Sequence, residues 1–204
     1  MYGPNDFDET RLDLLKEIGN IGAGHAAEAL SLLLHKRIDM KIPSVTILPL
    51  NELISAENEK QVAASYIGID GDIKAYFFMI FESQSAKRLI DELVPDGTAF
   101  VNELAQSAFC EIANILCGSY LTALSSFLNI QITQTPPVYA ADMEGAILGE
   151  GLAELSLSND FVILINAVLS DRASQRQLKG DFYFMPVAES LDAIFRLTEG
   201  KSFL

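Results

Sequence analysis

The stretches EIGNIGAGHAAEALSLLLHKRIDMKIP (17–43) and EIANILCGSYLTALSSFLNIQITQTPP (111–137) decide the fold of this chain, because one repeats the other. They align without a gap at an offset of 94 residues, and 11 of the 27 aligned positions are identical. The identical positions include apolar residues at helical spacing and several polar residues. A duplicated structural unit is the simplest explanation of this pattern.

Each copy begins with a predicted amphipathic helix, over residues 11–35 and 103–128, because apolar side chains recur there every three or four positions. Segments rich in β-branched and aromatic residues follow, and Asp70-Gly71 is typical of a hairpin turn. The predicted strands are 44–50, 61–70 and 73–81 in the first copy, and 138–148, 151–158, 160–168 and 178–187 in the second. Residues 171–180 are expected to form an exposed loop.

A strand that leads into a closing helix ends each copy, over residues 75–93 and 181–197. We therefore predict an α/β (α+β) fold, in which two α-β-β-β-α halves related by a pseudo-two-fold axis share one continuous sheet. The halves are expected at about 11–97 and 103–204, within a single domain of residues 1–204. Because the repeat supplies its own pseudo-symmetric partner, we expect a monomer.

The composition restricts the class of partner. The 28 acidic and 14 basic residues give a net charge of −14, which would repel nucleic acid and an anionic membrane surface. No apolar run approaches the roughly 20 residues that cross a bilayer, and the N-terminus is acidic where a secretory signal would be basic. We expect a cytoplasmic protein without membrane insertion, whose partners are proteins. Cys110 and Cys117 are expected to be buried thiols, about 10 Å apart on one helix and too far for a disulfide.

One polar row is preserved in both predicted helices, with the spacing i, i+4, i+7, i+11. The rows are Asp13, Glu17, Asn20 and Gly24 in the first helix, and Ser107, Glu111, Asn114 and Gly118 in the second. These positions share one helical face, so the carboxylate and the carboxamide point the same way beside a small residue. Such a flat surface, which another backbone can approach closely, suits a partner protein better than a small molecule.

The chemistry open to this row is limited to positioning. A carboxamide can hold a water by donating and accepting at once, and a carboxylate can pair with a lysine of the partner. This is sufficient for an acyl phosphate, which is already reactive and passes through a loose transition state. The sequence offers no convincing Ser-His-Asp set and no cluster with metal-ligand spacing, so neither a nucleophile nor a metal is expected on this chain.

A proline lies 23 residues after each asparagine, at Pro43 and Pro137, and completes the pattern Asp/Ser-x3-Glu-x2-Asn-x22-Pro. This pattern resembles the signature of the CheC/CheX/FliY family of CheY-phosphate phosphatases, and both copies match it. The resemblance covers effectively the whole chain. Two intact copies and no appended domain favour the CheC type within this family.

The resemblance implies that phosphorylated CheY is the substrate and that Asn20 and Asn114 orient the hydrolytic water. It implies that Glu17 and Glu111 contact the CheY lysine beside the phosphoaspartate. Any Mg²⁺ is then expected in the aspartate site of CheY, with no cofactor on this chain. Relatives of the CheC type also bind the receptor deamidase CheD, which enhances their weak phosphatase activity.

Other readings of these residues remain open. Asp13 and Ser107 are equally explained as supports of a helix start or as polar contacts. Pro43 and Pro137 are explained as punctuation before a strand. The glycines within 19–24 fit either close packing of two helices or close approach of a substrate protein.

Two alternative functions also follow from this sequence. The first is a non-enzymatic adaptor that binds CheD or CheY, and the second is a component of the flagellar switch. A structural duplication should keep apolar core positions and let surface residues change. Here the polar row survives in both copies, which favours the phosphatase.

Overall fold

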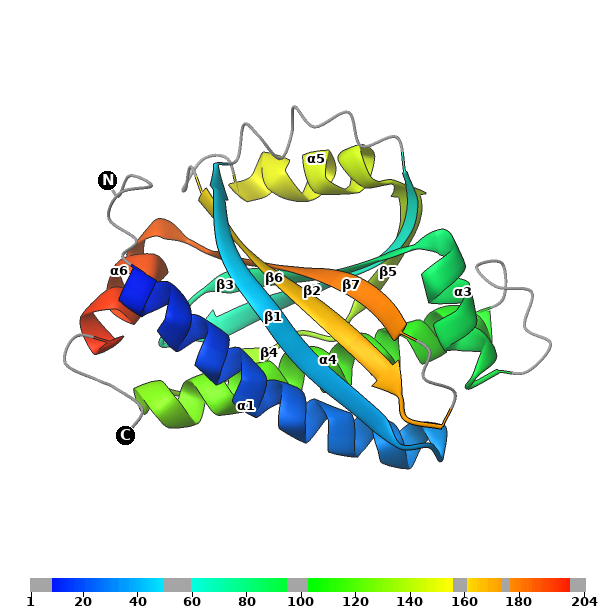
Figure 1. Ribbon diagram of the computed structural model, residues 1–204. Helices are drawn as coiled ribbons and strands as arrows, with labels where there is room; N and C mark the ends of the chain where they lie inside the picture. The colour runs from blue at the N-terminus through cyan, green and yellow to red at the C-terminus, as the bar shows by residue number, and fades with distance from the viewer. Residues whose placement is uncertain (1–8, 50–59, 95–102, 156–160, 174–176, 199–204) are drawn as a thin grey trace.

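The computed structural model describes residues 9–49, 60–94, 103–155, 161–173 and 177–198 (Figure 1). The strands are β1 (Ile38–Pro49), β2 (Gln61–Gly71), β3 (Ala75–Glu82), β4 (Ile132–Gln134), β5 (Val138–Met143), β6 (Phe161–Asp171) and β7 (Gln177–Pro186). The helices are α1 (Glu9–Leu34), α3 (Ser83–Asp91), α4 (Glu103–Leu128), α5 (Glu144–Leu155) and α6 (Ala188–Thr198).

All seven strands join one curled antiparallel sheet, with the order β1-β6-β7-β3-β2-β4 and with β5 also paired to β2. Strands β3 and β7, one from each copy, lie side by side in its middle. The strand order is symmetric under exchange of the two copies. In this exchange β1 takes the place of β4 and β5, β2 that of β6, and β3 that of β7. The mixed fold with duplicated halves on a shared sheet agrees with the prediction, whereas the boundaries of the two repeats stay a prediction.

Both edges of the sheet are irregular at the motif proline. In β1 the pairing with β6 shifts its register around Pro43. In the second copy, residues 135–137 separate β4 from β5, although both of these strands pair with β2. The first strand was predicted at 44–50 but begins at Ile38, because an edge strand tolerates a proline at a bulge.

The two long helices lie where the sequence predicted them and pack against each other on one face of the sheet (Figure 1). Buried side chains of α4, among them Phe109, Ile112 and Leu124, contribute to the main core. An 18-residue stretch of α4 has a mean hydropathy of 1.3, so this helix is long and apolar enough to cross a membrane by length and composition alone. Half of this stretch is buried inside the molecule, as in the core helix of a globular fold.

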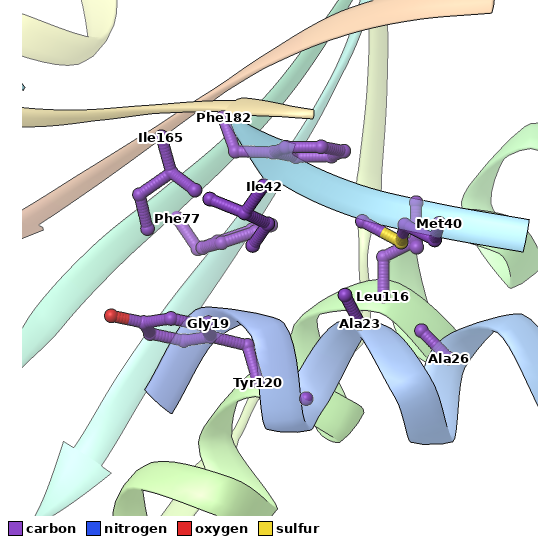
Figure 2. A pocket seen from close by; sticks show the side chains of 11 residues that line it. Gly19, Ala23, Ala26, Met40, Ile42, Phe77, Leu116, Tyr120, Ile165 and Phe182 are labelled. Carbon is purple, nitrogen blue, oxygen red and sulfur yellow. The ribbon is translucent and has the colours of Figure 1, made fainter. Parts of the chain in front are cut away.

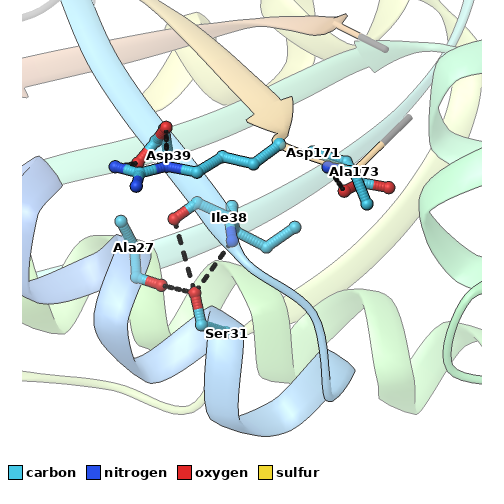
Figure 3. Close-up of polar contacts among 7 residues, drawn as sticks. Ala27, Ser31, Ile38, Asp39, Asp171 and Ala173 are labelled. Carbon is cyan, nitrogen blue, oxygen red and sulfur yellow. Dashed lines mark hydrogen bonds and ion pairs between the residues drawn. The ribbon is translucent and has the colours of Figure 1, made fainter. Parts of the chain in front are cut away.

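Repeated serines tie both long helices to the chain segment that follows them. Ser31 donates its hydroxyl to the carbonyl of Ala27 over 2.6 Å and accepts the backbone N–H of Ile38 over 2.9 Å (Figure 3). Its repeat partner Ser125 donates to the carbonyl of Ile130. This serine is therefore identical in the two copies for a structural reason.

The residue after each long helix takes a left-handed conformation. His35 has a φ of 50°, and its repeat partner Asn129 has a φ of 58°. A left-handed residue commonly ends a helix, and glycine or asparagine adopts this conformation most readily. The backbone thus repeats here although the side chain does not.

The hairpin predicted at Asp70-Gly71 joins β2 to β3. Gly71 has a φ of 126°, and a Cβ on it would lie 2.3 Å from the carbonyl oxygen of Gln131, so this position requires glycine. The predicted exposed loop 171–180 is shorter than expected, because residues 177–180 belong to β7 and pair with β6. Residues 174–176 lie outside the described part of the chain.

Helix α5 corrects the predicted strand 151–158 and the end of the predicted strand 138–148. Strand β5 stops at Met143, and α5 crosses the face of the sheet opposite α1 and α4 (Figure 1). Ile147 and Leu148 are buried there in a second apolar cluster. Packing against this face therefore overrides the strand pattern. The predicted strand residues 50, 156–158 and 160 lie outside the described residues.

Candidate functional site

The first polar row lies along the exposed side of α1. Asp13 and Glu17 are exposed, and Asn20 is half-buried where the helix meets β1. Asn20 accepts the backbone N–H of Ile42 at its Oδ1 over 3.1 Å. Its Nδ2 has no hydrogen-bond partner among the described residues, so the carboxamide is held by its oxygen and offers its N–H donors.

The strand irregularity at Pro43 provides the donor that holds Asn20. Ile42 and Pro43 together oppose the single residue Ala167 of β6, which is the arrangement of a β-bulge. The bulge turns the N–H of Ile42 toward α1, and Pro43 has no N–H of its own to leave unpaired. This proline therefore lies at the bulge, next to the residue that binds the asparagine.

The second polar row lies along α4 in the same order. Ser107 and Glu111 are exposed, and Asn114 is half-buried. Here the donor to Asn114 Oδ1 is a side chain, the Nε2 of Gln134, over 2.5 Å. Within the part of the chain that the structure describes, the Nδ2 of Asn114 also has no partner.

The repeat shows why the donor differs between the two rows. Ile42, which holds Asn20 in the first copy, corresponds to Pro136, and a proline has no N–H to donate. Gln134, two residues earlier and the last residue of β4, corresponds to Met40. The second copy has thus exchanged a backbone donor for a side-chain donor.

A hollow of about 410 Å³ borders the second row, although a flat surface was expected there. Its lining consists of Ser107, Cys110, Glu111, Asn114, Gln134, Thr135, Pro136 and Pro137. Cys110 is a free, half-buried thiol, and Cys117 is free and buried. Burial raises the pKa of Cys110, so this thiol stays protonated at neutral pH and offers no thiolate nucleophile.

The two glycines of the polar rows differ in their surroundings. No atom lies within 4 Å of the place where a Cβ on Gly24 would stand, whereas a Cβ on Gly118 would lie 3.7 Å from the amide oxygen of Gln134. A neighbouring glycine has a packing role, since a Cβ on Gly22 would lie 2.9 Å from the Cα of Tyr120. Close helix packing therefore explains Gly22, and Gly24 remains open to an approaching partner.

The helix crossing leaves a small apolar cavity of about 20 Å³ against the sheet (Figure 2). Gly19 lines this cavity, and a Cβ on it would lie 2.8 Å from the Cδ1 of Ile42. The Tyr120 ring packs on Phe184 with centroids 5.8 Å apart, and its buried hydroxyl has no partner among the described residues. The other lining residues are glycines or carry apolar side chains, so the cavity has no cluster of polar groups.

The sequence identified the polar rows, but it did not identify Ile42 and Gln134, which hold the two asparagines. The only available signal was a departure from the repeat, at the pairs Met40/Gln134 and Ile42/Pro136. In the described ranges, no group of three or more His, Cys, Asp or Glu side chains is arranged to hold a metal ion.

The model of the CheC-like family matches residues 11–47 and 104–139, which contain both polar rows and both motif prolines. The chain is 34% identical over 198 residues to the CheY-P phosphatase CheC of Bacillus subtilis (strain 168). The aligned region covers 94% of this chain and 95% of that protein. It is also 31% identical over 138 residues to the flagellar motor switch phosphatase FliY of the same bacterium, across 65% of this chain and 36% of that protein.

The fold agrees with a solved structure of similar extent. The X-ray crystal structure of Thermotoga maritima FliY matches with a TM-score of 0.76 at 19% identity, over 96% of this chain and 99% of the other. This likeness concerns the fold alone, whereas the identity to the Bacillus subtilis protein extends over nearly the whole chain. The chain belongs to the CheC-like family.

Proposed function

We propose that this chain is a protein phosphatase of chemotaxis, which hydrolyses the phosphoaspartate of phosphorylated CheY in the cytoplasm. The observation that carries the proposal is the equivalent placement of Asn20 and Asn114. In each copy the carboxamide oxygen is held from the strand side and the Nδ2 group is left to donate. Two polar rows with this geometry supply two active sites.

In the proposed reaction, a water attacks the phosphorus of the phosphoaspartate in line with the bond to the carboxylate oxygen. The phosphorus–oxygen bond breaks, which releases inorganic phosphate and restores the aspartate carboxylate. Asn20 or Asn114 orients the water, using an N–H of Nδ2 and the second lone pair of Oδ1. Orientation is the main requirement, because an acyl phosphate needs little further activation.

Glu17 and Glu111 are proposed to bind the lysine of CheY beside the phosphoaspartate. Each lies one helical turn before the asparagine of its row, and each is exposed. Neither carboxylate has an ion-pair partner among the described residues. A lysine of a docked protein could therefore pair with it without displacing an internal contact.

We further propose, from the family resemblance, that CheD binds this chain and enhances its activity. No cofactor is assigned to this chain, and the Mg²⁺ of the reaction belongs to the aspartate site of CheY. The chain is proposed to act as a monomer, with both polar rows on one polypeptide.

The proposed function is tested by the decay of phosphorylated CheY in the presence of Mg²⁺. The variants are Asn20→Ala, Asn114→Ala and the double variant, and the matched control is Gln84→Ala, which removes an exposed amide from α3. We expect the double variant to leave only the intrinsic decay of CheY, while the control equals the wild type. A wild-type chain that does not accelerate the decay, even with CheD added, would instead indicate the adaptor.

A further inference from the structure

We propose that Gln134 is a positioning residue of the second site. Its side chain holds the carboxamide oxygen of Asn114, as the backbone N–H of Ile42 holds that of Asn20 at the first site. This inference rests on the proposed function, because it concerns the asparagine of the second polar row. It predicts that the two sites depend on different residues of their edge strands.

The contacts of Gln134 are those expected of a positioning residue. Its Nε2 lies 2.5 Å from the Oδ1 of Asn114 and 3.5 Å from the backbone carbonyl oxygen of the same residue. The side chain that orients the asparagine thus also contacts the helix that carries it. With Pro136 in place of Ile42, the strand offers no backbone N–H at the equivalent position.

The other end of the Gln134 amide argues against a role in stability alone. Its Oε1 is buried and has no hydrogen-bond partner in the described part of the chain. An unpaired buried amide oxygen is unfavourable, and the methionine that the first copy has at this position, Met40, would avoid it. Glutamine at this position is therefore explained by its contact with Asn114.

The surroundings of Gln134 are adapted to its amide. Gly118, on the turn of α4 that follows Asn114, has no side chain, and a Cβ there would lie 3.7 Å from Oε1 and 3.8 Å from Nε2 of Gln134. In the first copy the equivalent Gly24 has nothing within 4 Å of this position. Gly118 thus lies under the positioning amide, which also lines the hollow beside the second row.

The test isolates the second site by using Asn20→Ala as the background. In this background, Gln134→Met should lower kcat for phosphorylated CheY by on the order of tenfold or more, with a KM within about twofold, since orientation of the water is lost and docking is kept. Adding Pro136→Ile restores an N–H at position 136 and should recover most of kcat. Met40→Gln, the reciprocal exchange in the first copy, is the matched control and should leave kcat of the second site unchanged.

A double-mutant cycle separates positioning from damage to the fold. In a chain that keeps Asn20 and carries Asn114→Ala, the first site supplies the remaining activity. Adding Gln134→Met to this chain should cause no further loss, because the asparagine on which Gln134 acts is absent. The side-chain Nδ2 amide resonance of Asn114, followed by NMR, should shift in Gln134→Met and should return toward its wild-type position with Pro136→Ile added. This readout does not depend on activity.

Several results would overturn the inference. An unchanged kcat or an unmoved Asn114 resonance in Gln134→Met would show that the contact does not position the amide, and an equal loss in the Asn114→Ala background would show a general structural role. If Asn20→Ala alone is inactive while the wild type is active, the second site does not operate and the inference fails, although the phosphatase stands. If the wild type is inactive, both fail.

Discussion

Ile42 donates its backbone N–H to the side-chain oxygen of Asn20 over 3.1 Å, which joins the middle of helix α1 to the edge strand β1. This bond decides which end of the carboxamide is presented, because the oxygen is bound on the strand side and the nitrogen is left without a partner among the described residues. The donor is available because Pro43 introduces a bulge into β1. The spacing between asparagine and proline in the sequence thus reflects a contact between a helix and a strand.

Replacement of the first asparagine by aspartate tests the need for its donor group. Asn20→Asp keeps an acceptor for the N–H of Ile42 but removes both N–H donors and places a negative charge near the phosphoryl group. In the Asn114→Ala background, we expect the decay of phosphorylated CheY to slow by about two orders of magnitude, while the melting temperature changes little. An Asn20→Asp variant that keeps its rate would show that the Nδ2 group has no part in the reaction.

The two exposed glutamates should act on binding of the partner. Glu17→Gln combined with Glu111→Gln is expected to raise KM for phosphorylated CheY several-fold at low ionic strength, because attraction to a lysine is lost. The difference should decrease as salt screens the charges. Steady-state kinetics at two salt concentrations measure this, and Glu189→Gln, an exposed position on α6, is the control. A loss confined to kcat, independent of salt, would contradict the assignment.

The buried hydroxyl of Tyr120 should reduce stability. Burial raises the pKa of Tyr120, and the hydroxyl has no partner among the described residues. Tyr120→Phe removes an unpaired polar group and keeps the ring, so we expect a gain of about 1 kcal/mol in the free energy of unfolding and an unchanged phosphatase rate. Urea denaturation measures this. Tyr183→Phe is the control that should lower stability, because the hydroxyl of Tyr183 donates to Glu144; a similar loss in Tyr120→Phe would contradict the expectation.

The repeat explains how much of the fold could be predicted. It indicated both long helices and the polar rows together, because the repeated polar residues have the spacing of one helical face. Helix α5 was missed because Gly145 and Gly149 lower its helix propensity, and burial of Ile147 and Leu148 on the sheet, a tertiary effect, decides its structure.

The site was predicted as two equivalent rows, and the structure makes them unequal. A one-dimensional alignment shows Gln134 in place of a methionine and Pro136 in place of an isoleucine as two unrelated differences. Only the three-dimensional contact shows that one compensates for the other, because the lost backbone donor and the gained side-chain donor reach the same kind of oxygen. Compensation of this kind has no periodicity and leaves no motif.

The environment of Glu144 predicts a pH dependence of stability. Glu144 is buried at the start of α5, and burial raises its pKa above the usual 4.5; Asp181 and Glu82 add to this effect, and the hydroxyl of Tyr183 and the charge of Lys60 oppose it. A raised pKa means that the folded state binds the proton more tightly than the unfolded state does. The stabilisation from Glu144 is therefore fully present below pH 4.5 and is lost as the pH rises through the pKa of the folded state.

Glu144→Gln should remove this loss, because an amide stays neutral and its oxygen can still accept the hydroxyl of Tyr183. We expect the variant to be more stable than the wild type at pH 7, with a difference that shrinks as the pH falls toward 4.5. Urea midpoints over this pH range measure the effect, and Glu92→Gln, which removes an exposed carboxylate paired with Lys36 and away from Glu144, should not produce it. Equal or lower stability of Glu144→Gln at pH 7 would mean that Lys60 and Tyr183 stabilise the carboxylate by more than its burial costs.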